Sequence, residues 1–298
     1  QLHWINGFLS INDINKINKP IIWRFSDFWP CSGIYHYENF ENAKEPYFLK
    51  IINNLIKNYK INLWKKRIKI ITPSIWMKTL VERSYTFKNF EINVINTPIN
   101  KNTFKKNKSK KLKSKYGIDD KKNIILFGAE NLDDPRKGFT DIIELFEKQY
   151  LDKNDYQIIT FGNYKVLKNK IKKLNIKNFG YLESKEKLND IYNCADLMII
   201  TSRMDNLPQV GLEAQMSGLP LVVYNNSGLS ELVEDKHTGF IAENSSISSL
   251  ANCIKLFFSN SQIQNNFSLN SIKRAEENFS EEVVLNKYCK IYGEILRK

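Results

Sequence analysis

The sequence is short of the residues that bind metal ions or build disulfide frameworks. Its 298 residues include four cysteines and three histidines. The cysteines are far apart and form no C-x-x-C pair: Cys31, Cys194, Cys253 and Cys289. This spacing lacks the usual zinc-binding motifs and predicts reduced, structural cysteines in a cytoplasmic protein with no bound metal.

Long apolar runs are missing as well. The mean hydropathy is -0.43, and the sequence holds no uncharged apolar run of the ~18 residues that a transmembrane helix needs. No basic segment followed by an apolar core opens the sequence, so we expect no secretory signal. The first residues, Gln1-Leu2-His3-Trp4-Ile5, lack an initiator Met, and we expect the chain to begin inside a domain.

Acidic residues are in the minority, which gives a net charge of +13 and a pI of about 9.3. Such a charge favours nucleic acid, phosphorylated substrates or an acidic membrane leaflet as partners. An AT-rich coding bias also produces an excess of Lys, Ile and Asn, so the charge alone does not indicate which of these partners the protein binds. Nucleic-acid motifs are absent, as is a G-x-G-x-x-G after a strand, so we expect neither a nucleic-acid partner nor a nicotinamide cofactor.

Apolar runs alternate with amphipathic stretches along most of the chain. Strands are expected at 123–128, 156–162, 195–201 and 219–223, with helical spacing between them. This alternation predicts a mostly parallel, doubly wound sheet over 123–245. The first hundred residues repeat the pattern less regularly and supply about half of such a sheet, with strands at 20–25, 67–72 and 90–95 and a helix at 47–60.

Two further segments flank this α/β region. The lysine-rich stretch 101–122 is either a solvated hinge or a contact for phosphate or lipid headgroups. From Ser280 a final helix is expected, and its apolar face is predicted to carry Val284, Tyr288, Tyr292 and Ile295.

The strongest chemical signal lies between Thr201 and Ala214. An apolar strand ends at Thr201 and a helix begins near Pro208, which places the loop at the carboxyl end of a parallel strand. Backbone N–H groups at such a helix start attract phosphate. Asp205 and Glu213 would add two carboxylates around the same pocket, which suits the hydroxyls of a nucleotide sugar. An ordinary strand–loop–helix with a buried Glu213 is the alternative.

The same run resembles a known family. Asp205-x7-Glu213-Ala214, followed by Gly218-Leu219-Pro220-Leu221-Val222, is similar to the motif of the group-1, or family 4, retaining glycosyltransferases of the GT-B fold. The segments 228–233 and 235–240 resemble that family downstream, and Pro135-Arg136-Lys137-Gly138-Phe139 resembles its Lys-Gly element. The segment Trp23 to Gly33 is similar to the acceptor lobe of members that build bacterial polysaccharides.

The resemblance implies an α/β fold of two facing Rossmann-like lobes, the first of them partial. Residues 1–104 would form the partial N-terminal acceptor lobe and 105–278 the C-terminal nucleotide-sugar donor lobe. Residues 279–298 would form a helix that crosses back to the N-terminal lobe. The family's Gly-rich loop and about its first quarter are not found, so the chain is expected to be incomplete at its N-terminus.

The resemblance also implies a reaction. A sugar would move, with retention, from a nucleotide diphosphate sugar to a glycan or lipid-linked acceptor, without metal or other cofactor. Lys137, Arg136 and the N–H groups from Asn206 to Val210 would meet the diphosphate, Glu213 the ribose and Asp205 a sugar hydroxyl. The catalytic residues implied are Asp205, Lys137 and Asp27, and the donor-binding residues are Arg136, Lys137, Asn206, Leu207, Gln209, Val210, Glu213 and Tyr181.

Some positions depart from the family pattern. Asp205 replaces the usual Glu, and Ser26 stands before Asp27 where the family often has His. Tyr181 is either a neighbour of the donor base or a packed aromatic. The alternative to an active transferase is therefore a catalytically inactive relative that only binds nucleotide sugars. We expect the protein in the cytoplasm, with peripheral contact at the acidic inner face of the plasma membrane as a further expectation.

Overall fold

The computed structural model describes residues 1–5, 7–37, 46–64, 68–107 and 110–297. They divide into two compact units: unit 1 holds residues 1–97 and 286–298, and unit 2 holds 98–285. Residues 98–104, placed with the first lobe by the sequence analysis, thus belong to unit 2. The reason is local, because the Ile99 N–H donates to the Phe279 carbonyl at 2.8 Å and the buried Phe104 ring packs beside Tyr192.

Unit 1 is built on a three-stranded parallel sheet in the order β1-β2-β3. The strands are β1 (Ile22–Arg24), β2 (Lys69–Thr72) and β3 (Ile92–Val94), which confirms the three predicted strands in shorter form. The helical segments are α1 (Ile11–Lys16), the 3-10 turn η1 (Trp29–Cys31), α3 (Tyr47–Leu63) and α4 (Ile75–Arg83). Buried aromatic rings fill the core, with Trp23 and Phe87 each in edge-on contact with Phe25.

Arg24 connects β1 to the chain segments that follow β3. Its buried guanidinium donates to the Ile95 carbonyl at 2.6 Å and to Thr97 Oγ1 at 3.0 Å. It also donates to Tyr288 Oη at 3.2 Å. A buried charge needs such partners, and these three acceptors satisfy it within unit 1.

Tyr288 lies on the last helix, α12 (Glu281–Leu296), which begins in unit 2 and ends in unit 1. Val284 and Ile291 are buried along it. The predicted apolar face was wrong for Tyr292, which is 40% exposed. Its hydroxyl donates to Gln1 Oε1 at 2.5 Å, so the polar end of this side chain forms a hydrogen bond within unit 1.

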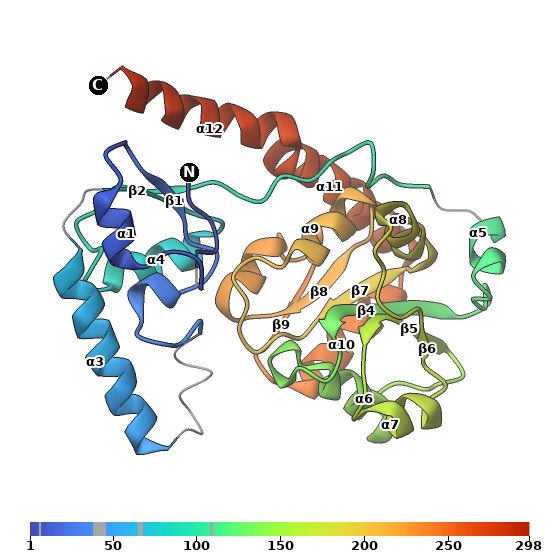
Figure 1. Ribbon diagram of the computed structural model, residues 1–298. Coiled ribbons are helices and arrows are strands. Elements are labelled where there is room, and N and C mark those ends of the chain that lie inside the picture. Colours follow the sequence, from blue (N-terminus) through green and yellow to red (C-terminus); the bar gives the residue numbers. More distant parts are fainter. Residues whose placement is uncertain (6, 38–45, 65–67, 108–109, 298) are drawn as a thin grey trace. The chain divides into compact units, whose positions relative to one another are not determined.

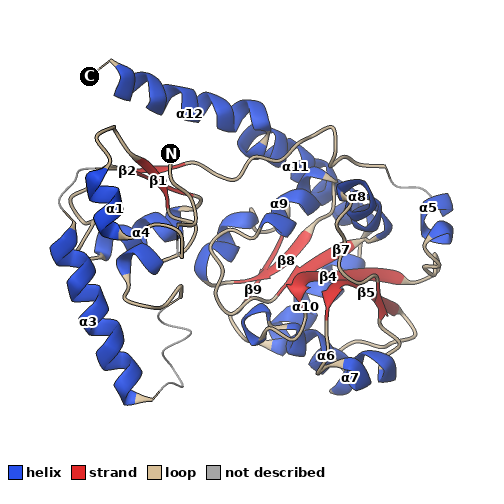
Figure 2. Cartoon of the chain, in the orientation of Figure 1, coloured by secondary structure: helices blue, strands red, loops and turns tan. Residues whose placement is uncertain are grey.

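Unit 2 is a six-stranded, wholly parallel sheet in the order β6-β5-β4-β7-β8-β9 (Figure 2). This confirms the doubly wound sheet predicted for 123–245. The strands are β4 (Asn123–Asn131), β5 (Tyr156–Asn163), β6 (Lys177–Asn178), β7 (Leu197–Ile200), β8 (Leu221–Tyr224) and β9 (Gly239–Ala242).

Helices cover both faces of this sheet. Figure 1 shows α6 (Phe139–Glu147), α7 (Lys168–Lys173) and α10 (Ile247–Phe258) on one side, and α8 (Lys185–Cys194), α9 (Gln209–Met216) and α11 (Ser261–Phe279) on the other. Parallel strands require such crossover helices. The remaining helical segments of unit 2 are α5 (Lys110–Lys115), η3 (Pro135–Lys137) and η4 (Ser227–Leu232).

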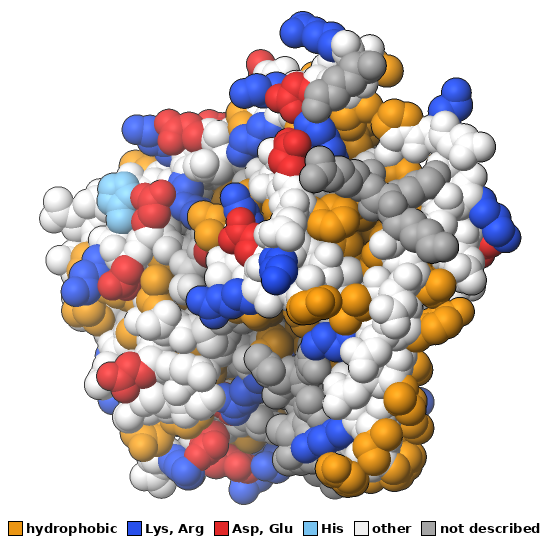
Figure 3. All heavy atoms as spheres, turned by 90° about the vertical axis from the view of Figure 1, so that its left-hand side faces the viewer, with side chains coloured by type: hydrophobic (Ala, Val, Ile, Leu, Met, Phe, Trp, Pro, Cys, Tyr) orange, Lys and Arg blue, Asp and Glu red, His pale blue; other side chains and the backbone are white. Residues whose placement is uncertain are grey.

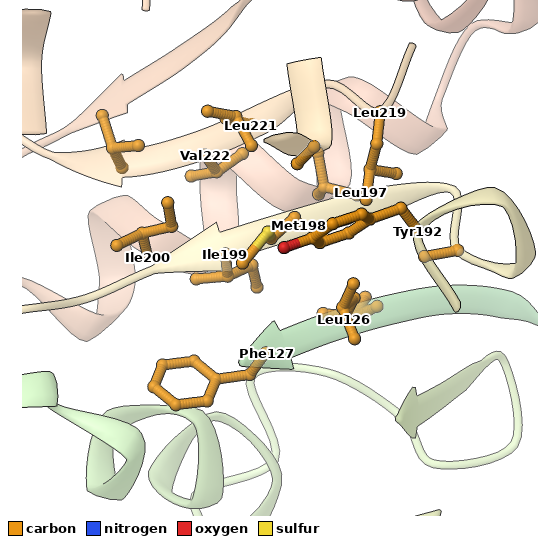
Figure 4. Packing of buried hydrophobic residues seen from close by; sticks show 14 of the residues in the cluster. Leu126, Phe127, Tyr192, Leu197, Met198, Ile199, Ile200, Leu219, Leu221 and Val222 are labelled. Carbon is orange, nitrogen blue, oxygen red and sulfur yellow. The ribbon is translucent and has the colours of Figure 1, made fainter. Parts of the chain in front are cut away.

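The central strands are buried on both sides, which explains their unbroken apolar sequences. Figure 4 shows side chains of β4, β7 and β8 packed together, among them Leu126, Met198 and Leu221, which are fully buried. Phe104, Leu112 and Ile118 belong to the same core. The solvated hinge expected over 101–122 is therefore wrong for these residues, while 108–109 lie outside the described residues.

Gly138 allows two loops of unit 2 to approach each other closely. It has a φ of +73°, and a Cβ atom there would lie 2.1 Å from the Thr201 carbonyl oxygen. Gly180 has a similar φ of +69°, but a Cβ atom would meet nothing within 4 Å. Alanine substitutions at these two positions therefore distinguish two contributions to the loss of stability: the left-handed backbone alone at Gly180, and the left-handed backbone with a steric clash at Gly138.

We expect Gly180→Ala to lower the free energy of unfolding by about 1 kcal/mol, since only the backbone conformation is unfavourable. Gly138→Ala should lower it by about 2–4 kcal/mol, because the loop after β7 must also move. Urea denaturation followed by circular dichroism measures both. Equal losses would contradict the close approach.

Candidate functional site

The strand order of unit 2 reverses between β4 and β7. From β4 the chain adds β5 and β6 on one side, and from β7 it adds β8 and β9 on the other. Because all strands are parallel, their carboxyl ends lie at one edge, and the crevice at such a reversal is where doubly wound sheets bind ligands. The segments that follow these two strands contain η3 after β4 and residues 201–208 after β7.

The two segments are joined by hydrogen bonds to backbone carbonyls. The Arg203 N–H donates to the Arg136 carbonyl at 2.7 Å, and Thr201 Oγ1 donates to the Gly138 carbonyl at 2.9 Å. The Arg136 guanidinium in turn donates to the Met204 carbonyl at 3.1 Å. The sequence predicts that these segments act together, and the fold brings them into contact.

Two cations meet one carboxylate at this junction. Lys137 Nζ lies 2.5 Å from Asp205 Oδ2, and Arg136 Nη1 lies 3.4 Å from the same oxygen. Arg136 Nη2 also lies 3.3 Å from Asp134 Oδ2. The side chains of Lys137 and Arg136 are 23% and 21% exposed, so both cations can still be reached from solvent. A charge-assisted site of this kind suits an anionic, phosphate-like group.

The loop that carries Asp205 is fixed from a third segment, which follows β8. Ser227 Oγ accepts from the Asp205 N–H at 3.1 Å, and the Gly228 N–H donates to the Asp205 carbonyl at 3.0 Å. A Cβ atom on Gly228 would lie 1.3 Å from the Asn206 carbonyl oxygen, so only glycine allows this approach. Asn206 and Leu207 are both buried in the loop. The Asp205 backbone is thus held in place before any ligand binds.

Helix α9 begins directly after this loop. Pro208 is its N-cap residue and Gln209 its first helical residue, which confirms the helix start predicted near Pro208. Among the described residues no side chain caps this end, where Gln209 is exposed and Val210 is half-buried. Uncapped N–H groups and the positive end of the helix dipole favour an anion here.

Glu213 lies one turn further along α9 and is 5% exposed. Tyr192 Oη donates to Glu213 Oε2 at 2.9 Å, and Gln209 Nε2 donates to Oε1 at 2.8 Å. Burial raises the pKa of Glu213, against the opposite effect of the hydrogen bonds from Gln209 and Tyr192. Tyr192 could not be recognised from the sequence, because it lies on a different helix, α8, and resembles any other aromatic residue of an amphipathic pattern.

Glu213 and Asp205 therefore have different partners, and among the described residues no hydrogen bond joins the two carboxylates. The sequence predicted two carboxylates around one pocket, and in the structure each of the two carboxylates has its own set of contacts. One is a partly buried ion-pair cluster around Asp205, and the other is a buried network of neutral partners around Glu213.

Tyr181 stands apart from the other candidates of unit 2. It follows β6, and two strands, β5 and β4, separate β6 from β7. Its side chain is 56% exposed, so the alternative of a packed aromatic is wrong.

Asp27 belongs to unit 1 and follows β1. It is 6% exposed, its Oδ2 lies 2.5 Å from His36 Nδ1, and its Oδ1 accepts from the Trp29 N–H at 3.0 Å. The His36 ring stacks on Trp4, with ring centroids 5.5 Å apart. These residues line a small hollow together with Arg24, Phe25 and Ser26. Ser26 stands where the family often has His, but the fold brings an imidazole to Asp27 from His36, nine positions further along the chain.

Two larger cavities lie at the opposite edge of the unit 2 sheet. They have volumes of about 420 and 670 Å³ and lie near the amino ends of β4 and β5, where Lys153, Lys173 and Leu174 line both. Ligands of doubly wound sheets bind at the carboxyl edge, so these cavities are not part of the candidate site.

Comparisons with known proteins agree with this architecture. The family model described as "Glycosyl transferases group 1" matches residues 108–274, which is more than half of the chain. The chain therefore belongs to the group 1 glycosyl transferases. Its fold, α/β with two parallel sheets, is of the GT-B class predicted from the sequence.

Three similar proteins illustrate the range of the family. The N-acetyl-alpha-D-glucosaminyl L-malate synthase of Bacillus anthracis is 21% identical over 70% of this chain and 55% of its own length. The capsular polysaccharide biosynthesis glycosyltransferase CapM of Staphylococcus aureus is 23% identical over 36% of this chain and 28% of its own. Anabaena Alr3699/HepE, solved in complex with UDP, superposes with a TM-score of 0.75 at 18% identity, covering 92% of this chain and 72% of that protein. The chain spans about half the length of the first curated relatives it matches.

The buried Glu213 network predicts a pH-dependent stability. A carboxyl group whose pKa is raised by folding keeps its proton at pH values where the unfolded chain has released it, so stability falls as pH rises through that window. The free energy of unfolding of the wild type, relative to that of Glu213→Gln, should therefore decrease as the pH rises above 4.5, the ordinary pKa of a Glu carboxyl. It should level off once the pH exceeds the raised pKa of Glu213 in the folded protein.

Urea denaturation of both proteins between about pH 4 and 8 measures the difference, over the range in which carboxyl groups titrate. Glu277→Gln, at an exposed position of α11, serves as the control and should leave the pH profile unchanged. A difference between wild type and Glu213→Gln that does not vary with pH would contradict the pKa shift.

Proposed function

We propose that the protein is a retaining, hexosyltransferase-like glycosyltransferase that moves a sugar from a nucleotide diphosphate sugar to a glycan or lipid-linked acceptor. The observation that carries the proposal is the cluster of Lys137, Arg136 and Asp205 at the reversal of strand order in unit 2. It supports a diphosphate site, because two accessible cations lie at the edge where the uncapped end of α9 also begins.

The proposed roles follow from the chemistry of each side chain. Lys137, Arg136 and the N–H groups between Asn206 and Val210 neutralise the charge that develops on the leaving diphosphate. Asp205 exchanges its contacts with the two cations for a hydroxyl group of the sugar. This exchange couples donor binding to the release of an ion pair.

The nucleoside is proposed to lie beside Glu213 and Tyr181. Glu213 accepts hydrogen bonds from the ribose, since each of its carboxylate oxygens has a further lone pair beyond those used by Tyr192 and Gln209. The exposed ring of Tyr181 is available to the base.

In unit 1, Asp27 and its partner His36 are proposed to act on the acceptor. A carboxylate held against an imidazole can accept the proton of a hydroxyl group or orient that group. The neighbouring Trp4 ring is 65% exposed and offers a flat apolar surface to a sugar.

The reaction is proposed to need no metal ion, with the cations of unit 2 in its place. The setting is proposed to be the cytoplasm, at the inner face of the plasma membrane, in the assembly of a surface polysaccharide or lipopolysaccharide. Two findings support this: the positive net charge favours an acidic leaflet, and similar proteins act in capsule biosynthesis. No helix in the described part of the chain is long and apolar enough to span a bilayer.

Removing the phosphate-binding cation should abolish most of the activity. We expect Lys137→Ala to lower the rate of sugar transfer by about a hundredfold or more, as loss of an electrostatic contact in a transition state does. Glu213→Ala should also lower the rate of transfer, because the ribose of the donor loses its carboxylate partner. Transfer of radiolabelled sugar from a panel of nucleotide sugars measures this.

Lys148→Ala is the matched control, because Lys148 is a mostly exposed lysine paired with Glu144 on α6. Wild-type turnover in both Lys137→Ala and Glu213→Ala would overturn the site. Nucleotide binding without transfer or donor hydrolysis in the wild type would instead identify a binding-only relative.

Asp205 should affect transfer and diphosphate binding in opposite directions. Asp205→Asn removes the negative charge beside Lys137 and Arg136, so the affinity for inorganic pyrophosphate and UDP should rise by about two- to tenfold. Transfer should fall, because the sugar loses its carboxylate partner. Calorimetry at fixed ionic strength measures the affinity, and weaker UDP binding in the variant would contradict the proposed role.

A further inference from the structure

One ion pair of unit 2 differs from the charges on the protein surface. Figure 3 shows basic and acidic side chains intermixed on one face of the molecule, where solvent screens them and each pair contributes little to stability. Arg203 Nη2, by contrast, lies 2.5 Å from Asp141 Oδ1, and the two side chains are 29% and 3% exposed. A carboxylate as buried as that of Asp141 is unfavourable unless its partners are in place, so the pair constrains the segments that carry it.

Both carboxylate oxygens of Asp141 accept hydrogen bonds. Oδ1 accepts from Arg203 Nη2, and Oδ2 accepts from Tyr224 Oη at 2.6 Å. Asp141 lies in the first turn of α6, whereas Arg203 follows β7 and Tyr224 is the last residue of β8. Burial raises the pKa of Tyr224, and its hydrogen bond to Asp141 raises that pKa further, so the phenol remains a donor. One buried carboxylate therefore joins the start of α6 to the carboxyl ends of two strands.

Arg203 connects this carboxylate to the candidate diphosphate site. Its N–H donates to the carbonyl of Arg136, which directly precedes Lys137, at 2.7 Å. Its side chain is held by Asp141, which lies beyond Lys137 on α6. A second guanidinium nitrogen, Nη1, donates at 2.9 Å to the hydroxyl of Ser245 in the segment after β9. Arg203 therefore fixes both ends of the short segment on which Lys137 lies.

The same residue also borders the loop that carries Asp205. The carbonyl of Met204, which lies between Arg203 and Asp205, accepts from the Arg136 guanidinium at 3.1 Å. Lys137 Nζ lies 2.5 Å from Asp205 Oδ2. The relative position of this cation and this carboxylate thus depends on two backbone segments that Arg203 joins.

The charges of the pair separate two possible roles of Arg203. The pair carries no net charge, so at the distance of a bound anion its two fields oppose each other. If Arg203 attracted the anion directly, loss of the Asp141 charge would free the guanidinium and strengthen anion binding. If the pair acts through the position of its neighbours, loss of either charge weakens anion binding.

We propose that Arg203 and Asp141 are positioning residues of the diphosphate site, which hold Lys137 and the Asp205 loop in the geometry that a diphosphate group requires. Neither side chain touches the ligand. Their remaining hydrogen bonds extend the constraint to the end of β8 and to the segment after β9. The proposal rests on the diphosphate site of the proposed function and names residues that preorganise it.

Calorimetry with inorganic pyrophosphate at fixed ionic strength tests the proposal without a sugar donor. We expect Arg203→Ala and Asp141→Asn each to weaken pyrophosphate binding by about tenfold, although they change the local charge in opposite directions. The double variant should bind about as weakly as the weaker single variant, because both substitutions break the same contact. Stronger binding by Asp141→Asn would overturn the proposal and identify Arg203 as a direct ligand.

The length and charge of the side chain at position 203 provide a second comparison. Arg203→Lys should bind pyrophosphate within about threefold of the wild type, since an ammonium group still pairs with Asp141. Arg203→Gln has a long side chain without charge and should remain as weak as Arg203→Ala. A lysine variant as weak as the alanine variant would contradict the role of the ion pair.

The effect should pass through Lys137. In a Lys137→Ala background, Arg203→Ala should weaken pyrophosphate binding by less than about threefold, since the cation that Arg203 positions is then absent. General destabilisation would not depend on this background. A further tenfold loss in the absence of Lys137 would therefore overturn the proposal.

Lys113→Ala is the matched control, because Lys113 forms a partly buried ion pair with Asp196 at the opposite edge of the same two strands. Asp196 directly precedes β7, and its Oδ2 accepts from the Ile124 N–H near the start of β4. We expect this variant to have a lower thermal midpoint and an unchanged affinity for pyrophosphate. Circular dichroism establishes that each variant is folded, and an equal loss of affinity in Lys113→Ala would assign the effect to stability alone.

The same measurements distinguish failure of this proposal from failure of the proposed function. A wild type that binds no pyrophosphate would refute the diphosphate site and the positioning role together. A wild type that binds it, with an Arg203→Ala variant that is folded and binds it equally well, would refute the positioning role alone.

Discussion

Asp205 provides the negative charge between two neighbouring strand ends, and the geometry of the candidate site depends on that contact. Lys137 and Arg136 follow β4 and Asp205 follows β7. The ion pairs form because these strands are adjacent, although their carboxyl ends are 69 positions apart in the sequence. Gly138 and Gly228 lack the Cβ atoms that would keep the three loops apart. A site with fixed loops and accessible cations requires little rearrangement to receive an anion.

Unit 1 uses buried polar groups in a comparable way. Asn53 and Lys60 bind the backbone of the turn from Trp29 to Ile34, and the same turn region holds Asp27 next to His36. Buried polar groups are costly unless their hydrogen bonds are satisfied, so they determine orientation more strictly than apolar packing does. One set of contacts thus holds the turn that carries a candidate acceptor-side pair and anchors α3 to that turn.

Much of the fold could be predicted from the sequence, because parallel strands buried on both faces give unbroken apolar runs. The runs at 123–128 and 219–223 became β4 and β8. Asp205 was recognisable because a carboxylate directly after such a run reaches the ligand-binding edge. Arg136 and Lys137 were recognised from their resemblance to the Lys-Gly element of the family. Tyr192 and His36 were not recognised, since their partners, Glu213 and Asp27, lie on other elements and no periodicity relates them.

The sequence by itself determined the strand and helix alternation, the order of the motifs and the absence of long apolar runs. Those properties follow from local composition and from the periods of 2 and 3.6 residues that strands and helices impose. Only the tertiary structure decided that Asp205 pairs with Lys137 while Glu213 is buried with Tyr192, and that α3 buries Asn53 and Lys60. Those contacts depend on which elements become neighbours, and the local periodicity of a chain does not specify its neighbours in space.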